Sequence, residues 1–236
     1  MGKLQRSLIF TVLLLLFCLS WLGAETDGPK LFVLNLSSFT LDIRLQDEET
    51  KAFEAHGVRP NWATRLEPLK ERGDFVLYFR QTGENEWYQW AETPGSPVPC
   101  RVESGNVYCI LFTREGEILY SALDEEYTES PQVCFANLSG KALSEVELGE
   151  AWQHETKLEL ENLKDRTITG FLPVLSGSHA FFWAFQDNEL DHYTYIDQER
   201  EEPEFFELQK GEYYIFAVAA GKNTVFPLVF KITPYY

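Results

Sequence analysis

The chain contains one sequence unit twice, and this repeat constrains its fold more than any other feature. Asn35-Leu36-Ser37 follows an apolar run in the first copy, and Asn137-Leu138-Ser139 follows another 102 residues later. Gly105–Phe112 and Gly211–Val218 are glycine-led, aromatic-rich segments that are 106 residues apart. A period near one hundred residues indicates duplicated domains, because solenoid repeats run to roughly 20–50 residues.

The residue pattern within each copy is typical of strands. Phe75–Gln81 aligns with Ala180–Gln186 at an offset of 105 residues, and both segments are rich in aromatic residues, which favour pleated surfaces. Leu41–Leu45 alternates apolar with charged residues, as half-buried strands do. We therefore predict an all-β chain of two antiparallel β-sandwich domains, immunoglobulin-like or jelly-roll-like. A mixed α+β fold is the alternative, because Gly149–Asn162 combines helix-forming residues with strand-like alternation.

The N-terminus predicts export. Residues 1–24 combine Lys3 and Arg6 with an apolar run, Leu8–Leu19, and end at Ala24, as a cleavable signal peptide does. The run is shorter than the roughly 20 residues of a membrane span, and no later segment reaches that length, so no span is expected after cleavage. We predict domains at residues 25–128 and 129–236, with a polar boundary in Asp124–Pro131.

Charge and cysteine content narrow the possible partners. The formal charge of −17 becomes −19 once the two basic residues of the signal peptide are removed. Such a chain is repelled by nucleic acid and by anionic lipid, and it resists non-specific contact with an anionic polysaccharide. The mature chain keeps Cys100, Cys109 and Cys134, which allow at most one disulfide, and spacing does not choose among the three pairings. Cys109 matches Ile215 of the second copy, which favours a buried apolar role.

The sequence carries no familiar catalytic or cofactor signature. The four histidines lack metal-binding spacing, no cysteine pair has zinc-site spacing, and there is no glycine-rich phosphate loop. Ser176-Gly177-Ser178-His179 lacks the nucleophile-elbow pattern and aligns with Arg72-Gly73-Asp74, so we interpret it as a tight turn. We expect no enzyme activity, no catalytic residue, no metal and no cofactor.

Two aromatic residues suggest a carbohydrate surface. Trp87 and Trp90 lie three residues apart, and exposed tryptophan rings can stack on sugar rings. The alternative is that such rings fill a sandwich core, which is the usual role of aromatics in β proteins. Asn35 and Asn137 open formal glycosylation sequons, but their duplication favours a structural role in a turn after the first strand.

The two copies differ most in one loop. The first copy has a proline-rich stretch and the second an acidic one at the matching place, and divergent loops are where partner selection usually resides. A solvated loop without a partner is the alternative. The candidate partner residues are Pro94, Pro97 and Pro99 in the first copy and Glu199, Glu201, Glu202 and Glu204 in the second.

The chain resembles the family of periplasmic alginate O-acetylation proteins typified by AlgF. The resemblance rests on the export signal, on Val33–Ser37 with Ser104–Phe112, and on Cys134–Ser139 with Lys210–Val218, about a quarter of the mature chain. It implies tandem small β-sandwich domains and a non-catalytic periplasmic adaptor. Such an adaptor would contact membrane-bound and periplasmic O-acetyltransferase proteins of an exported, alginate-like polysaccharide. The alternatives are a secreted carbohydrate-binding module and a structural envelope protein.

Overall fold

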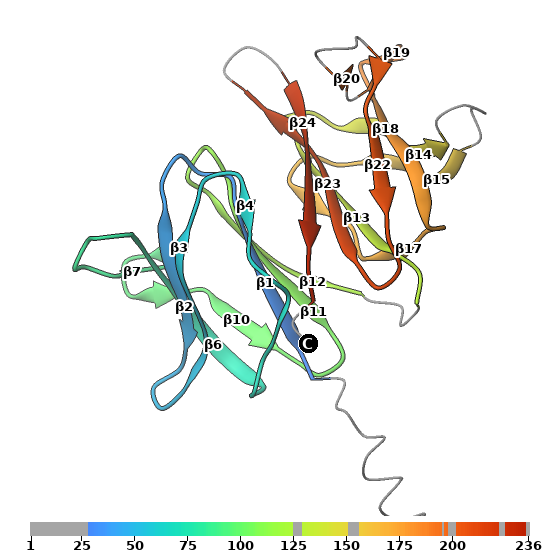
Figure 1. The fold of residues 1–236 in the computed structure, drawn as a ribbon. Coiled ribbons are helices and arrows are strands. Elements are labelled where there is room, and N and C mark those ends of the chain that lie inside the picture. Colours follow the sequence, from blue (N-terminus) through green and yellow to red (C-terminus); the bar gives the residue numbers. More distant parts are fainter. Residues whose placement is uncertain are drawn as a thin grey trace, which may run out of the picture.

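The computed structural model describes residues 28–124, 129–150, 156–194, 196–197, 202–221 and 225–234. This part of the chain forms two tandem β-sandwiches with no helix among the residues described, which confirms the predicted fold class (Figure 1). The predicted signal peptide lies outside the described residues. Within them, no helix has the length and apolarity needed to cross a membrane.

The first sandwich is built from two five-stranded sheets. Sheet I contains β1 (Lys30–Asn35), β4 (Trp62–Ala63), β5 (Glu67–Pro68), β11 (Val107–Phe112) and β12 (Ile118–Leu123). Sheet II contains β2 (Leu41–Gln46), β3 (Lys51–Val58), β6 (Gly73–Gln81), β7 (Tyr88–Gln89) and β10 (Pro99–Val102). A small hairpin of β8 (Ala91–Thr93) and β9 (Ser96–Pro97) lies between β7 and β10 in the chain.

The second sandwich repeats this strand order, so the two sequence copies fold alike. Sheet III contains β13 (Gln132–Leu138), β16 (Thr167–Ile168), β17 (Leu172–Pro173), β23 (Tyr213–Ala220) and β24 (Val225–Ile232). Sheet IV contains β14 (Leu143–Glu150), β15 (Thr156–Leu163), β18 (Gly177–Phe185), β19 (Asn188–Thr194) and β22 (Phe205–Leu208). The matching hairpin is β20 (Ile196–Asp197) with β21 (Glu202–Pro203). The described part of the ambiguous segment Gly149–Asn162 is thus strand rather than helix.

One pairing in each domain departs from the predicted antiparallel arrangement. β1 pairs with β11 in parallel, from Lys30 opposite Val107 to Asn35 opposite Phe112. β13 pairs with β23 in the same way. Parallel neighbouring strands need a long crossover connection, which the strands of the other sheet of the same sandwich supply. The first strand of each domain is also paired on its other edge, β1 with β4 and β5, and β13 with β16 and β17.

The register of the central strands corrects the sequence alignment by one residue. Gly73 and Gly177 both begin their strands at positive φ, 148° and 136°, and pair with the last residue of β10 and of β22. Phe75 therefore corresponds to His179, not to Ala180. Because successive side chains of a strand point to opposite faces, this one-residue slip decides which aromatic residues fill the core.

Three apolar cores hold the molecule together. One lies inside each sandwich, and the third joins the outer faces of sheets I and III across the domain junction. The residues of this third cluster, the junction core, include Phe32, Leu34, Leu66, Cys109, Leu123, Cys134, Phe171, Ile215, Phe230 and Ile232. Apolar burial on this scale makes the two sandwiches one packed unit rather than two domains on a hinge.

The three cysteines of the described residues, Cys100, Cys109 and Cys134, are buried free thiols. Cys109 and Cys134 lie in the junction core, as expected for the residue that matches Ile215. Cys100 lies in the first sandwich core, and burial raises the pKa of its thiol to about 12. Burial also raises the thiol pKa of the other two cysteines well above its usual range, which keeps all three protonated and unreactive.

The duplicated asparagines have the structural role that the repeat predicted. Asn35 is fully buried, and its Nδ2 donates to the carbonyl oxygens of Phe39 and Val58, each at 2.8 Å. Its Oδ1 accepts from both the amide and the hydroxyl of Ser37. Asn137 is fully buried too and binds Ser139 in the same way. In each copy the asparagine side chain therefore holds the turn after the first strand against a neighbouring strand.

Candidate functional site

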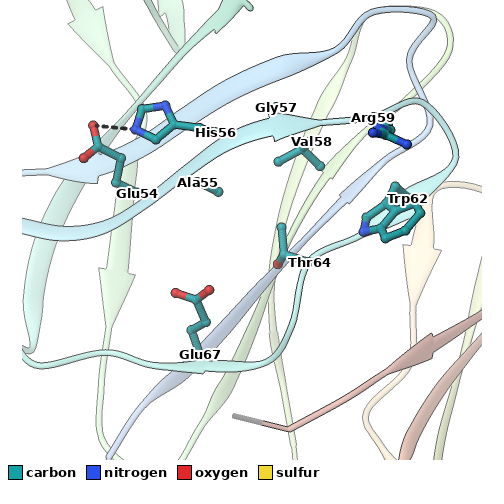
Figure 2. Close-up of a pocket in the computed structure, with 9 residues that line it drawn as sticks. All are labelled: Glu54, Ala55, His56, Gly57, Val58, Arg59, Trp62, Thr64 and Glu67. Atoms are coloured by element: carbon teal, nitrogen blue, oxygen red, sulfur yellow. Dashed lines mark ion pairs between the residues drawn. The ribbon is translucent and has the colours of Figure 1, made fainter.

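A hollow of about 500 Å³ opens on one side of the first sandwich (Figure 2). It lies between β3, the edge strand of sheet II, and β4–β5, the edge of sheet I. Its lining residues are Glu54, Ala55, His56, Gly57, Val58, Arg59, Trp62, Thr64 and Glu67. The concave surface therefore combines one indole ring with several charged groups.

The β3 wall is shaped by a bulge. The register between β2 and β3 shifts between Leu41 and Ile43, and Gly57 lies opposite this break with φ of 64°. Asp42 holds the bulge from the neighbouring strand, because its Oδ1 accepts the Gly57 amide at 3.0 Å. The bulge brings His56 and Gly57 to the rim of the hollow.

Asp42 is a buried carboxylate that is fully satisfied. Besides the Gly57 amide, it accepts from the Thr82 hydroxyl at 2.9 Å and from Arg80 Nε at 3.0 Å. Burial acts to raise the pKa of Asp42, but these three hydrogen bonds and the nearby His56 outweigh it, so the pKa lies below its ordinary value. The carboxylate remains charged and keeps the β3 wall in place.

His56 stands at the rim between two carboxylates. Its Nδ1 lies 3.6 Å from Asp42 Oδ1 and its Nε2 lies 3.7 Å from Glu54 Oε1. Figure 2 shows the Glu54–His56 pair at one end of the hollow, facing Glu67 across it. The imidazole is largely exposed, so it is available to a ligand as well as to these two carboxylates.

The opposite wall is fixed by Thr64. Its amide donates to the Val33 carbonyl oxygen at 2.9 Å, while its Oγ1 accepts the Val33 amide at 2.9 Å. The hydroxyl thus replaces a backbone partner in the gap between β4 and β5. Trp62, two residues earlier, is held opposite Asn35 of β1, and its side chain is 56% exposed.

Glu67 faces into the hollow from β5 (Figure 2). Partial burial raises the pKa of its carboxyl above the ordinary value, and the nearby Arg65 guanidinium opposes this shift only in part. Glu67 therefore takes up a proton more readily than an exposed glutamate.

A second hollow of about 380 Å³ lies at the domain junction, between β4 and β24. It is lined by Asn61, Trp62, Ala63, Thr64, Arg65, Val229, Phe230, Lys231 and Thr233. Trp62 and Thr64 line both hollows. The indole therefore stands on the ridge that the two concave surfaces share.

The polar groups of the first hollow are mostly engaged with neighbouring backbone or carboxylates, and its indole is exposed. The Thr64 hydroxyl, the one alcohol in the first hollow, is engaged with Val33 and with the Arg65 carbonyl oxygen. Among the described residues, no group of three His, Cys, Asp or Glu side chains could hold a metal ion. What the site offers is an exposed aromatic face with hydrogen-bonding groups around it.

The two tryptophans expected to form a sugar platform lie on different faces of sheet II. Trp90 packs against the first sandwich core. Trp87 lies on the outer face, where the guanidinium groups of Arg44 and Arg80 lie over its ring. Their Cζ atoms are 4.2 and 4.5 Å from the ring centroid. The structure therefore does not combine the two rings into a single stacking surface.

The predicted partner loops are hairpins rather than irregular loops. Pro94, Pro97 and Pro99 are exposed on or next to the β8–β9 hairpin, whose turn contains Gly95 at φ of 84°. Glu202 belongs to β21 and Glu204 is half-buried beside it, whereas Glu199 and Glu201 lie outside the described residues. Within the part of the two hairpins that the structure describes, no residue lines either hollow.

The serine–histidine segment has no catalytic geometry. Ser176 forms a bend that leads into β18 at Gly177. His179 occupies the core position of Phe75, is 2% exposed, and donates through Nε2 to the Leu175 carbonyl oxygen at 2.9 Å. It is a core residue.

Trp62 is the site residue that the sequence interpretation missed. It lies in a two-residue strand, where no periodicity can mark it. The available signal was a difference between the copies, because Asn61-Trp62-Ala63-Thr64 corresponds to Arg166-Thr167-Ile168-Thr169. Thr64 and Thr169 are equivalent, while the indole is unique to the first copy.

Comparison with known proteins gives no family. No protein-family model matches the chain, and no curated protein matches it. Among solved structures it is similar to the C-terminally truncated tip fimbrial protein Mfa3 from Porphyromonas gingivalis (11% identity, 86% of this chain, 99% of that chain, TM-score 0.27). It is also similar to a putative cell adhesion protein from Parabacteroides distasonis (7% identity, 89% and 98% coverage, TM-score 0.23). Similarity at this level carries no argument about function.

Proposed function

We propose that this protein is an exported, non-catalytic glycan-binding protein. Its proposed site is the exposed surface of Trp62 together with the two hollows that this residue lines. The observation that carries the proposal is the exposed indole on the ridge between two concave surfaces, held by the Thr64–Val33 hydrogen bonds. Residues that are rigid, aromatic and surrounded by polar groups are the usual elements of ligand sites. Export follows from the predicted signal peptide.

The chemistry of the hollow matches that of a sugar. The apolar C–H face of a pyranose can stack on an indole, whose ring offers a large and rigid apolar contact area. Glu54 and Glu67 can accept hydrogen bonds from hydroxyl groups, while Arg59 and His56 can donate them. Such a shallow, preformed site can bind without a conformational change.

The accessory role in polysaccharide O-acetylation remains a prediction that rests on the resemblance to the AlgF family. A glycan site would suit a protein of that class, because it would hold the polymer near its modifying enzymes. Docking of O-acetyltransferase proteins through the two hairpins is a separate hypothesis and needs a separate pull-down experiment from the native envelope.

The test of the proposal is a glycan array followed by titration calorimetry with the protein lacking residues 1–24. Trp62→Ala is expected to reduce affinity for the selected glycan at least about tenfold, which corresponds to about 1.4 kcal/mol. Tyr88→Ala is the matched control, because Tyr88 is 48% exposed and lies outside both hollows. Trp87→Ala should also leave binding intact.

Two results would remove the proposal. One is the absence of any glycan ligand across a broad array. The other is a glycan whose affinity falls with Trp87→Ala but not with Trp62→Ala, which would place binding on the outer face of sheet II.

A further inference from the structure

The junction hollow differs in charge from the rest of the protein. Its charged lining residues are Arg65 and Lys231, and no Asp or Glu lines it. Arg59 lies close to Trp62 on the adjoining side (Figure 2). Three cationic side chains therefore lie near the indole in a chain whose formal net charge is −17, and the two carboxylates nearby, Glu54 and Glu67, line the first hollow only. A cationic patch against such a background is a specific electrostatic feature.

Most of this positive charge is available to a ligand. Among the described residues, neither Arg59 nor Arg65 forms an ion pair, although Arg65 is close enough to Glu67 to influence its carboxyl. Lys231 Nζ lies 3.3 Å from Glu212 Oε1 and 3.3 Å from Gln209 Oε1, both at the long end of hydrogen bonding. A guanidinium has a planar fork of donors that matches a carboxylate or a sulfate ester.

Both domains build this hollow. Arg65 follows β4 of the first sandwich, while Lys231 belongs to β24 of the second. The Leu66 amide donates to the Thr233 carbonyl oxygen at 3.2 Å, and Phe230 lies in the junction core, so the two walls are fixed relative to each other. A ligand that contacts Arg65 and Lys231 together therefore bridges the two domains.

From these observations we propose that the glycan ligand is a linear anionic saccharide. One sugar unit stacks on Trp62, and the carboxylate or sulfate of a neighbouring unit binds Arg65 and Lys231 in the junction hollow. This inference rests on the proposed glycan-binding function and adds the chemical class of the ligand. It also assigns Arg65 and Lys231 as specificity-determining residues.

The decisive comparison uses oligogalacturonate and its methyl ester, which have the same backbone with and without charge. Calorimetry at low and moderate salt should show at least about tenfold tighter binding of the acid, with affinity that falls as salt is added. Chondroitin sulfate is the third probe: tighter binding of it than of oligogalacturonate would support the anionic class and identify sulfate as the group.

Matched variants test the residues. Arg65→Gln and Lys231→Gln should each reduce the affinity for oligogalacturonate several-fold and leave the affinity for its methyl ester unchanged. Lys141→Gln is the control, since Lys141 is an exposed lysine of the second sandwich that pairs with Asp187 and lines neither hollow. Melting temperatures of the variants confirm that each one folds.

The outcomes separate the two proposals. Equal affinity for acid and ester, reduced by Trp62→Ala in both cases, would overturn the anionic class and keep glycan binding. Loss of acid binding in Lys141→Gln to the same extent as in Lys231→Gln would overturn the assignment of the junction hollow. Failure of all three probes to bind would overturn the anionic class, and glycan binding itself would fall if the broad array were also empty.

Discussion

Leu66 and Phe171 occupy the same position in the two repeats and make the same hydrogen bond to the opposite domain. The Leu66 amide donates to the Thr233 carbonyl oxygen at 3.2 Å, and the Phe171 amide donates to the Asp124 carbonyl oxygen at 2.8 Å. Asp124 and Thr233 are themselves equivalent, since each follows the last strand of its sandwich directly. The two domains therefore face each other through a pseudo-twofold axis.

The junction core predicts cooperative unfolding. Phe32 is fully buried and its ring lies 6.3 Å from that of Phe171 across the junction. Phe32→Ala should lower the free energy of unfolding by about 3–5 kcal/mol, because it leaves a cavity that both domains line. Urea denaturation followed by fluorescence and circular dichroism should show one transition that shifts as a whole. The exposed Phe39 provides the control Phe39→Ala, and two separate transitions with only one of them shifted would contradict the shared core.

The internal repeat offers a control for the binding wall. Thr64→Val and Thr169→Val each remove a hydroxyl that accepts a strand amide at 2.9 Å, so each should cost about 1–3 kcal/mol of stability. Only Thr64→Val should also weaken glycan binding, because Thr64 fixes the strand that carries Trp62. Equal affinities of the two variants, measured by calorimetry, would show that this brace does not matter to the site.

The buried asparagines should be intolerant of substitution. Asn35→Ala leaves the carbonyl oxygens of Phe39 and Val58 without their donor and removes the acceptor of Ser37, so we expect a loss of about 2–4 kcal/mol. Asn35→Asp keeps the acceptor and loses the donor, and should give an intermediate value. Chemical denaturation measures both, with the exposed Asn85→Ala as reference. A loss below 0.5 kcal/mol for Asn35→Ala would mean that other groups supply the brace.

Asp42 predicts loss of stability in acid. Its folded-state pKa is depressed below the unfolded value of about 3.9, so its contribution is complete above that value and is lost as pH falls through the folded pKa. Asp42→Asn should be less stable than the wild type by about 1–3 kcal/mol at neutral pH, and the gap should close below about pH 4. Thermal melts from pH 7 to pH 2.5 test this. A gap that stays constant with pH would show that the Asp42 charge has no part in it.

Glu67 predicts that anion binding strengthens in mild acid. Its pKa is raised, so its negative charge is lost at a higher pH than that of an exposed glutamate, and repulsion of an anionic saccharide falls with it. The other ionisable residues that line the first hollow are Glu54, His56 and Arg59, and Arg65 lies near Glu67 from the side of the junction hollow, where Lys231 is the second cation. Affinity for oligogalacturonate should rise roughly twofold between pH 7 and pH 5, and Glu67→Gln should reduce this response. An unchanged response in Glu67→Gln would contradict the role of Glu67.

The sequence predicted the architecture well because the repeat is strong at the ends of each domain. The Asn-Leu-Ser openings and the glycine-led strands lie in the buried first and penultimate strands, where burial on both faces leaves a clear apolar signal. The parallel pairing of these strands was not predicted, since apolar runs do not reveal strand direction.

The central strands and the site were harder for physical reasons. Phe75 and His179 share one core position but differ in residue type. The sequence alignment instead matched the aromatic-rich segments that begin at Phe75 and Ala180, and it was wrong by one residue. Trp62 gained its importance from the approach of β24, a segment more than 160 residues away in the chain. No local pattern of residues carries that information.

The pseudo-twofold junction has an evolutionary consequence. In a dimer of identical subunits every substitution appears at both symmetry-related places, so a tryptophan beside one hollow would be accompanied by a tryptophan beside the other. Because the two copies lie in one chain, this restriction does not apply: Trp62 in the first copy corresponds to Thr167 in the second. The two sides of the junction can therefore carry different side chains while the backbone contacts of Leu66 and Phe171 remain equivalent.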